Sequence, residues 1–179
     1  MEKVAVFIDY ENISKVFGRE KLQIDLLALR DYLAEGRVLK EIFCYPGPSP
    51  IDNHSESDLW DFLMTNGFLI RFQPVQRDGI LHGDIRIQLV LDVVDYVIAV
   101  KPNIVVIVAG DGNYAPLATW LRRRGVRVEV ASAPNTVSQD FKLLANGFID
   151  LFRVLEQIQA GESDPARRKE VMTDARSDR

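Results

Sequence analysis

Short apolar runs alternate along the chain with segments of helical apolar spacing, and this alternation narrows the folds open to it. Five of the runs have the character of strands, at residues 3–9, 38–45, 68–75, 103–110 and 126–132. Runs that are apolar at consecutive positions are typical of strands buried on both faces, as in parallel sheets. Strands that alternate with helices build parallel βαβ units. The sequence therefore predicts an α/β three-layer sandwich around a mostly parallel sheet of five or six strands.

Segments with helical character fill the intervals between these runs. They are predicted at residues 22–36, 55–67, 84–100, 113–125 and 137–146. Gly36 is placed to end the first of them, and Asp84 to cap the long third one. In such a fold the carboxyl ends of the strands meet at one edge, where functional residues are usually found. Residues that directly follow the strands are therefore the candidates for chemistry.

The length and charge of the chain suit one folded domain followed by a short tail. We predict that residues 1–159 fold and that residues 160–179, which are highly charged and poor in large apolar side chains, form a disordered tail. The 22 Lys and Arg residues against 26 Asp and Glu residues give a net charge of −4. Because this balance lacks the basic character of dedicated nucleic-acid binders, RNA would have to be held by local basic patches.

Cys44 is the only cysteine of the chain, which excludes an intramolecular disulfide and a multi-cysteine zinc site. Its position in an apolar strand predicts a buried core residue. No apolar stretch has the length of a signal-peptide core or of a bilayer-spanning helix. We therefore expect a soluble cytoplasmic protein without a membrane partner.

Two carboxylates follow strands that would be neighbours in a sheet of order 3-2-1-4-5. Asp9 ends the first strand and Asp111 follows the fourth. At one sheet edge, these side chains would be close enough to share a hard divalent cation such as Mg²⁺ or Mn²⁺. Each acid also has a structural interpretation, Asp9 as a helix cap and Asp111 as part of a tight turn. An asparagine follows each acid, Asn12 and Asn113, which favours a functional role for the pair.

Four sequence blocks, spread over most of the chain, carry a family resemblance. They are VFIDYENI at residues 6–13, HGDIRIQLVLDVV at 82–94, VAGDGNYAPLATWLRRRGVRVEV at 108–130 and LANGFIDL at 144–151. Together they resemble the NYN domain family, within the LabA-like branch of the PIN-like nuclease superfamily, over residues 3–152. The resemblance implies a Rossmann-like PIN-type sandwich. It also implies a metal-dependent ribonuclease that hydrolyses the phosphodiester bonds of RNA, with Mg²⁺ or Mn²⁺ as its cofactor.

The family's site can be carried over to this chain only in part. Asn113 stands where a second Asp is common, and the Lys-Gly-x-x-Asp pattern of the second block has His82 and Arg86 at its ends. Replacing a carboxylate with Arg86 weakens a metal site unless Asp84 supplies the missing charge. The resemblance carries over Asp9, Asn12 and Asp111, with Asn113 in the place of a second acid. With Asp84 as a substitute for the lost acid, the predicted catalytic residues are Asp9, Asn12, Asp84, Asp111 and Asn113, and the predicted metal ligands are Asp9, Asp84 and Asp111.

Two basic side chains of the second block are candidates for contact with the substrate. Arg86 could clamp a phosphate directly, or it could pair with Asp9 or Asp111 and close the site. His82 could exchange protons near neutral pH, or it could be an ordinary surface residue.

Aromatic and arginine side chains provide further candidates for RNA contact. Tyr10 and Tyr114 follow the two strand-end acids closely, so we predict that they stack on bases of single-stranded RNA. Tyr45 and Phe72 are weaker candidates for the same role. The run RRRGVR at residues 122–127 offers positive charge, either to RNA or only to solvent and to the end of its helix.

Two functions of different classes remain open at this point. The first is a metal-dependent ribonuclease with a strand-end carboxylate site. The second is a catalytically weakened NYN domain that binds RNA or a protein partner without cutting, which the arginine at position 86 favours. Single-stranded or flexible RNA is the expected partner in the first case, and a homodimer is a further expectation.

Overall fold

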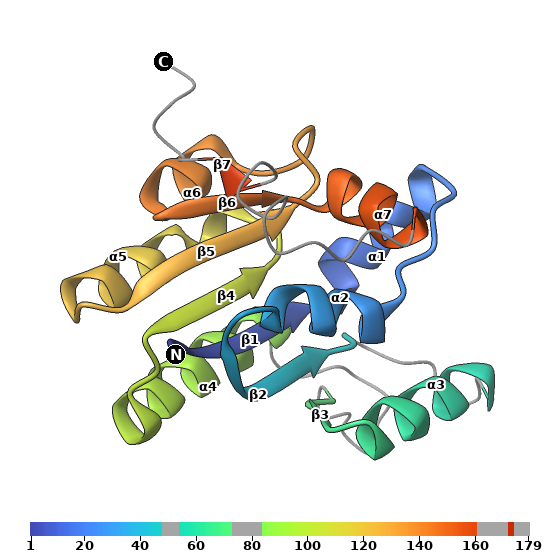
Figure 1. Ribbon diagram of the computed structural model, residues 1–179, viewed down its shortest axis with the longest axis horizontal. Coiled ribbons are helices and arrows are strands. Elements are labelled where there is room, and N and C mark those ends of the chain that lie inside the picture. The colour runs from blue at the N-terminus through green and yellow to red at the C-terminus, as the bar shows by residue number, and fades with distance from the viewer. Residues whose placement is uncertain (48–53, 73–83, 161–171, 174–179) are drawn as a thin grey trace.

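The predicted α/β sandwich is confirmed in a computed structural model, which describes residues 1–47, 54–72, 84–160 and 172–173. Its sheet has the order β3-β2-β1-β4-β5-β6-β7 (Figure 1), which contains the predicted order 3-2-1-4-5. Strands β1 to β6 pair in parallel, and β7 pairs with β6 in the antiparallel direction. The strands are β1 (Lys3–Asp9), β2 (Val38–Tyr45), β3 (Phe68–Ile70), β4 (Ile104–Val108), β5 (Arg127–Ser132), β6 (Gly147–Asp150) and β7 (Met172–Thr173).

Helices cover both faces of the sheet, because its central strands are apolar on both sides. In β1, Val4 and Val6 belong to the core under one face, and Ala5 and Phe7 belong to the core under the other. The first core contains side chains of α1 (Tyr10–Arg19), α2 (Leu26–Ala34), α3 (His54–Thr65) and α7 (Leu151–Gln159). The second contains side chains of α4 (Ile85–Val100), α5 (Ala115–Arg123) and α6 (Gln139–Leu144). A short 3-10 helix, η1 (Gly112–Tyr114), leads into α5.

Several boundaries differ from those expected from the sequence. Strand β3 ends at Ile70 rather than at residue 75, and residues 73–83 lie outside the described part of the chain. The segment after residue 146, which periodicity alone leaves unassigned, divides into β6 and α7. Within the expected tail, Met172 and Thr173 form β7, whereas residues 161–171 and 174–179 are not described.

Two predictions about the chain's environment can be compared with the structure. Cys44 is fully buried in the core, as predicted. Across the described ranges, no helix is long and apolar enough to cross a membrane.

A buried ion pair lies under the sheet, away from the strand-end acids. Glu129 on β5 has no exposed surface. Arg37 donates two hydrogen bonds to its carboxylate, at 2.7 and 2.9 Å, and Arg127 approaches the same carboxylate at 3.2 Å. Because burial of a lone charge is strongly unfavourable, Glu129 depends on these arginines for its stability in the core.

Candidate active site

The carboxyl edge of the sheet brings the two strand-end acids into one cavity. Strands β1 and β4 are hydrogen-bonded neighbours, with Ile8 paired to Val108. Asp9 is the last residue of β1, and Asp111 follows the end of β4. The cavity has a volume of about 280 Å³, and its lining residues are Asp9, Glu11, Asn12, Lys15, Asp84, Ile85, Arg86 and Asp111. We call this cavity the acidic pocket.

Asp9 is a buried carboxylate whose hydrogen-bond donors in the described part of the chain are neutral. Its side chain is 3% exposed. One oxygen, Oδ1, accepts from the backbone N–H of Asn12 at 3.0 Å, and Oδ2 accepts from the Tyr114 hydroxyl at 2.7 Å. Burial raises the pKa of Asp9, and the hydrogen bond from Tyr114 opposes this shift. Among the described side chains, no Lys, Arg or His forms an ion pair with Asp9. It therefore caps α1 and at the same time leaves a negative charge unbalanced in the pocket.

Arg86 pairs with two of the predicted metal ligands. Its Nη1 atom donates to Asp111 Oδ2 at 3.0 Å. Its Nε atom donates to both Asp84 oxygens at 2.8 and 2.9 Å, and its Nη2 atom also contacts Asp84. Hydrogen bonding by this guanidinium lowers the pKa of Asp84. Of the two interpretations of Arg86, pairing is therefore observed, and its partners are Asp84 and Asp111 rather than Asp9.

Two charged residues of the acidic pocket, Glu11 and Lys15, were not among the predicted site residues. Glu11 on α1 lies beside Gly47, and it forms an ion pair of 2.5 Å with Lys15 one helical turn later. A Cβ atom on Gly47, whose φ is +78°, would come within 2.7 Å of Glu11 Oε2. Glu11 could have been noticed as a second acid in the DYEN motif. With all groups ionised, four carboxylates and two cations give the pocket a formal charge of −2.

The two asparagines of the predicted site have different positions. The side-chain oxygen of Asn12 accepts from the backbone N–H of Gly110 at 2.9 Å, and this bond ties α1 to the loop that carries Asp111. Asn113 donates its backbone N–H to Asp111 Oδ1 at 2.9 Å, but it lines a neighbouring groove rather than the acidic pocket. Asn113 therefore lies beside the acidic pocket rather than among its lining residues, and its catalytic role stays a prediction.

The structure separates the aromatic candidates for base stacking. Tyr114 has no exposed surface and uses its hydroxyl to hold Asp9, so the prediction that it stacks on a base is wrong. Tyr45 is also fully buried, and its hydroxyl donates to Asp92 at 2.8 Å. The ring of Tyr10 is half-buried and lies edge-on against Trp60, at 5.0 Å between centroids. Phe72 is 47% exposed.

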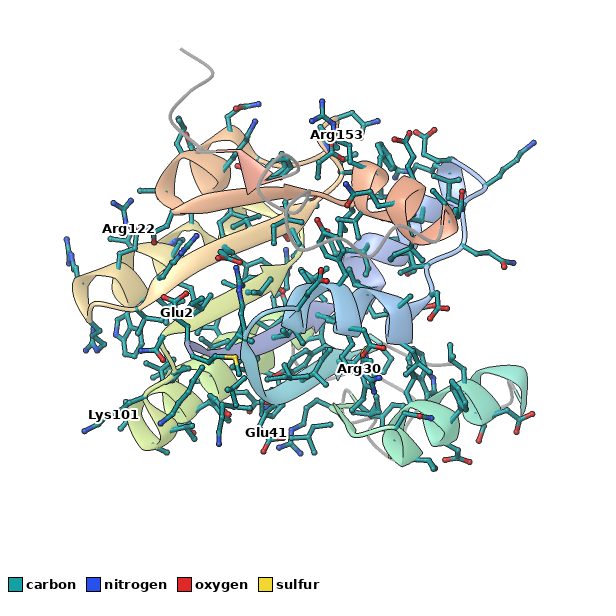
Figure 2. All side chains as sticks on the ribbon, in the orientation of Figure 1. Glu2, Arg30, Glu41, Lys101, Arg122 and Arg153 are labelled. Carbon is teal, nitrogen blue, oxygen red and sulfur yellow. The ribbon has the colours of Figure 1, made fainter. Side chains whose placement is uncertain are left out.

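Arg86 lines the acidic pocket, whereas the arginine run at residues 122–127 lies away from it. Figure 2 shows Arg122 at the left of the molecule, whereas β1 and β4 point their carboxyl ends to the right. Arg122 donates to the backbone oxygen of Leu144 at 3.0 Å, and Arg124 lies 3.7 Å from the ring centroid of Trp120. This placement favours the structural interpretation of the arginine run. His82 lies outside the described residues.

The donor chemistry of the pocket suits a hard divalent cation held by few protein ligands. Carboxylate oxygens are the ligands that Mg²⁺ and Mn²⁺ prefer, and Mg²⁺ usually keeps several waters beside one or two carboxylates. Asp9 and Asp111 meet this description, whereas Asp84 is occupied by Arg86. Where side chains are described, no group of three or more Asp, Glu, His or Cys residues is placed to hold a metal. The carboxylates of the pocket therefore have the donor chemistry for such a cation, although Arg86 already pairs with both Asp84 and Asp111.

The fold and the strand-end acids together define an α/β domain of the Rossmann-like, PIN-like type. The family model described as NYN domain matches residues 3–156, so the chain belongs to the NYN domain family of PIN-like nucleases. NYN domains generally bind RNA and depend on divalent metal ions.

A solved structure shares this fold. It is a protein of unknown function, VPA0982, from Vibrio parahaemolyticus RIMD 2210633, with 22% sequence identity and a TM-score of 0.72. The similarity covers 84% of this chain and 93% of that chain. Comparison with curated proteins finds no match.

Proposed function

We propose that this protein is a ribonuclease that depends on Mg²⁺ or Mn²⁺, with Asp9 and Asp111 as the metal ligands. The observation that carries the proposal is the position of Asp9. This carboxylate is buried and lines a negatively charged pocket. Its hydrogen-bond donors among the described residues are all neutral. A bound cation would balance its charge. The GDGN turn at Asp111 and the DYEN motif at Asp9 also support placement in the LabA-like branch.

The other residues of the pocket have positioning and binding roles in this proposal. When bound, the metal supplies positive charge to the phosphate and lowers the pKa of a water. Tyr114 orients Asp9 through its hydroxyl, and Asn12 holds the loop before Asp111. Lys15 and Arg86 are the cations available to attract the phosphates of an RNA strand into the pocket. RNA in a single-stranded or flexible form is the expected substrate, because it can enter such a strand-end site.

The ion pairs of Arg86 favour a second candidate function. Arg86 forms ion pairs with Asp84 and with one carboxylate oxygen of Asp111. It therefore occupies part of the space that a metal ion would need. In this alternative, the domain binds RNA through Arg86 and Lys15, or binds a protein partner, and does not cleave. The homodimer expected from the sequence remains a proposal.

Cleavage of RNA distinguishes the two candidates. Purified protein is incubated with single-stranded RNA and Mn²⁺, beside the variants Asp9→Asn and Asp95→Asn. Asp95 is an exposed acid of α4 that does not line the pocket, so its variant is a matched control. We expect cleavage by the wild type and by Asp95→Asn, and none by Asp9→Asn or after addition of EDTA. Cleavage that survives Asp9→Asn refutes the metal site. Binding of RNA without any cleavage supports the second candidate.

A further inference from the structure

An apolar groove adjoins the acidic pocket along α4. Its volume is about 330 Å³, which is within the range of small-molecule sites. Its lining residues are Asp84, Arg86, Ile87, Val90, Leu91, Asn113 and the buried Tyr114. Asp84 and Arg86 line both cavities, so this ion pair forms the wall between them. We call this cavity the α4 groove.

The apolar residues of the α4 groove are unusually open to solvent. Ile87 is 60% exposed and Leu91 is 55% exposed, while Val90 is partly buried between them and the core. Polar groups stand at the rim, namely the guanidinium of Arg86 and the exposed residue Asn113. A flat ligand with an apolar face, polar edges and an attached phosphate matches this combination of surfaces.

We propose that the α4 groove binds one base of the RNA substrate. In this arrangement the base packs against Ile87 and Leu91, Asn113 faces its polar edge, and Arg86 contacts the phosphate that enters the acidic pocket. The proposal rests on the proposed ribonuclease or RNA-binding function. It explains why two large aliphatic side chains remain exposed beside the site. It also gives Arg86 a role between the two cavities, because its guanidinium would contact the phosphate while the neighbouring side chains contact the base.

The size of the groove argues for a base rather than for a second copy of the chain. A stable protein interface covers roughly 800 Å² on each partner, whereas the groove is a small cavity continuous with a charged site. Ile98 lies on the same helix and is 60% exposed, but it lines a different cavity at the other end of α4. Comparison of Leu91 with Ile98 therefore separates a base site from a general apolar face.

Binding is measured without cleavage, by fluorescence anisotropy of a labelled single-stranded RNA octamer in EDTA. The proteins are the wild type, Leu91→Ser and the matched control Ile98→Ser. Leu91→Ser removes apolar carbon atoms that the base would cover, so we expect binding about fivefold weaker or more for Leu91→Ser and an unchanged Kd for Ile98→Ser. An octamer without bases provides a second arm. We expect the wild type to bind it more weakly than the normal RNA, and Leu91→Ser to show a smaller difference between the two.

The outcomes separate this inference from the proposed function. If the wild type binds RNA and Leu91→Ser binds equally well, the α4 groove is not a base site, although the proposed function stands. If both serine variants reduce self-association in sedimentation velocity, the face is an interface between copies and the inference is overturned. If the wild type neither binds nor cleaves RNA, the proposed function fails and this inference fails with it. Thermal melts serve as the control for folding. We expect both variants to remain folded, because both positions are exposed.

Discussion

Arg86 is the side chain whose removal tests the metal site most directly. It shares Asp111 with the proposed metal, and Asp111 Oδ2 already accepts a hydrogen bond from its Nη1 atom at 3.0 Å. The change Arg86→Gln keeps a polar, although shorter, side chain and removes the positive charge. We expect this variant to bind Mn²⁺ more tightly than the wild type, because a cation beside a cation site repels the incoming ion.

The size of this effect follows from the geometry of the pair. Metal–oxygen contacts are about 2.1 Å, so an ion on the same carboxylate oxygen would lie at most about 5 Å from the Arg86 nitrogen. Two unit charges about 5 Å apart in water repel by about 0.8 kcal/mol, and a divalent ion doubles this value. Water-like screening is appropriate because the Arg86 side chain is 40% exposed. The total of about 1.7 kcal/mol corresponds to about 15-fold in Kd.

The assay is a titration of metal-free protein with Mn²⁺, followed by electron paramagnetic resonance of the free ion. Arg123→Gln is the control, because Arg123 is exposed near the end of α5 and lines neither the acidic pocket nor the α4 groove. It removes the same charge from the whole protein but should leave the Kd unchanged. The gain of Arg86→Gln should shrink at high ionic strength, since salt screens exposed charges. Unchanged or weaker Mn²⁺ binding by Arg86→Gln would refute the reasoning.

Three further predictions concern the residues that shape the pocket and the core. Because burial raises the pKa of Asp9 above 3.8, the destabilisation by its charge builds up as the pH rises from 3.8 to the raised value and is complete above it. Asp9→Asn should therefore stabilise the metal-free protein by about 1 kcal/mol near pH 8 and less near pH 4, in denaturant titrations, and a pH-independent gain would contradict this. Arg37→Met should lower the free energy of unfolding by about 3 kcal/mol in urea, and adding Glu129→Leu should recover most of the loss unless the ion pair is itself stabilising. Asn12→Ala should lower it by about 1 kcal/mol and weaken Mn²⁺ binding, since the Gly110 N–H loses its acceptor, whereas equal Mn²⁺ affinity would show that this bond does not position Asp111.

Much of the fold follows from local properties of the chain. A strand that packs on both faces must be apolar at consecutive positions, so Val4 to Ile8 and Ile104 to Val108 could be recognised without any tertiary information. The shorter extent of β3 was not visible, because the apolar residues after Ile70 continue the pattern past the end of pairing. The β6–α7 boundary was also hidden, because one apolar segment there contains both a strand and a helix.

The layered architecture and the position of Asp9 and Asp111 at one sheet edge could be predicted before any coordinates. Both follow from the apolar periodicity and from the alternation of strands with helices. The pairing of Arg86 with Asp84 and Asp111, and the hydrogen bond from buried Tyr114 to Asp9, became visible in the folded chain. The partner of a charged or polar side chain depends on which distant elements pack beside it, and no local pattern encodes that choice.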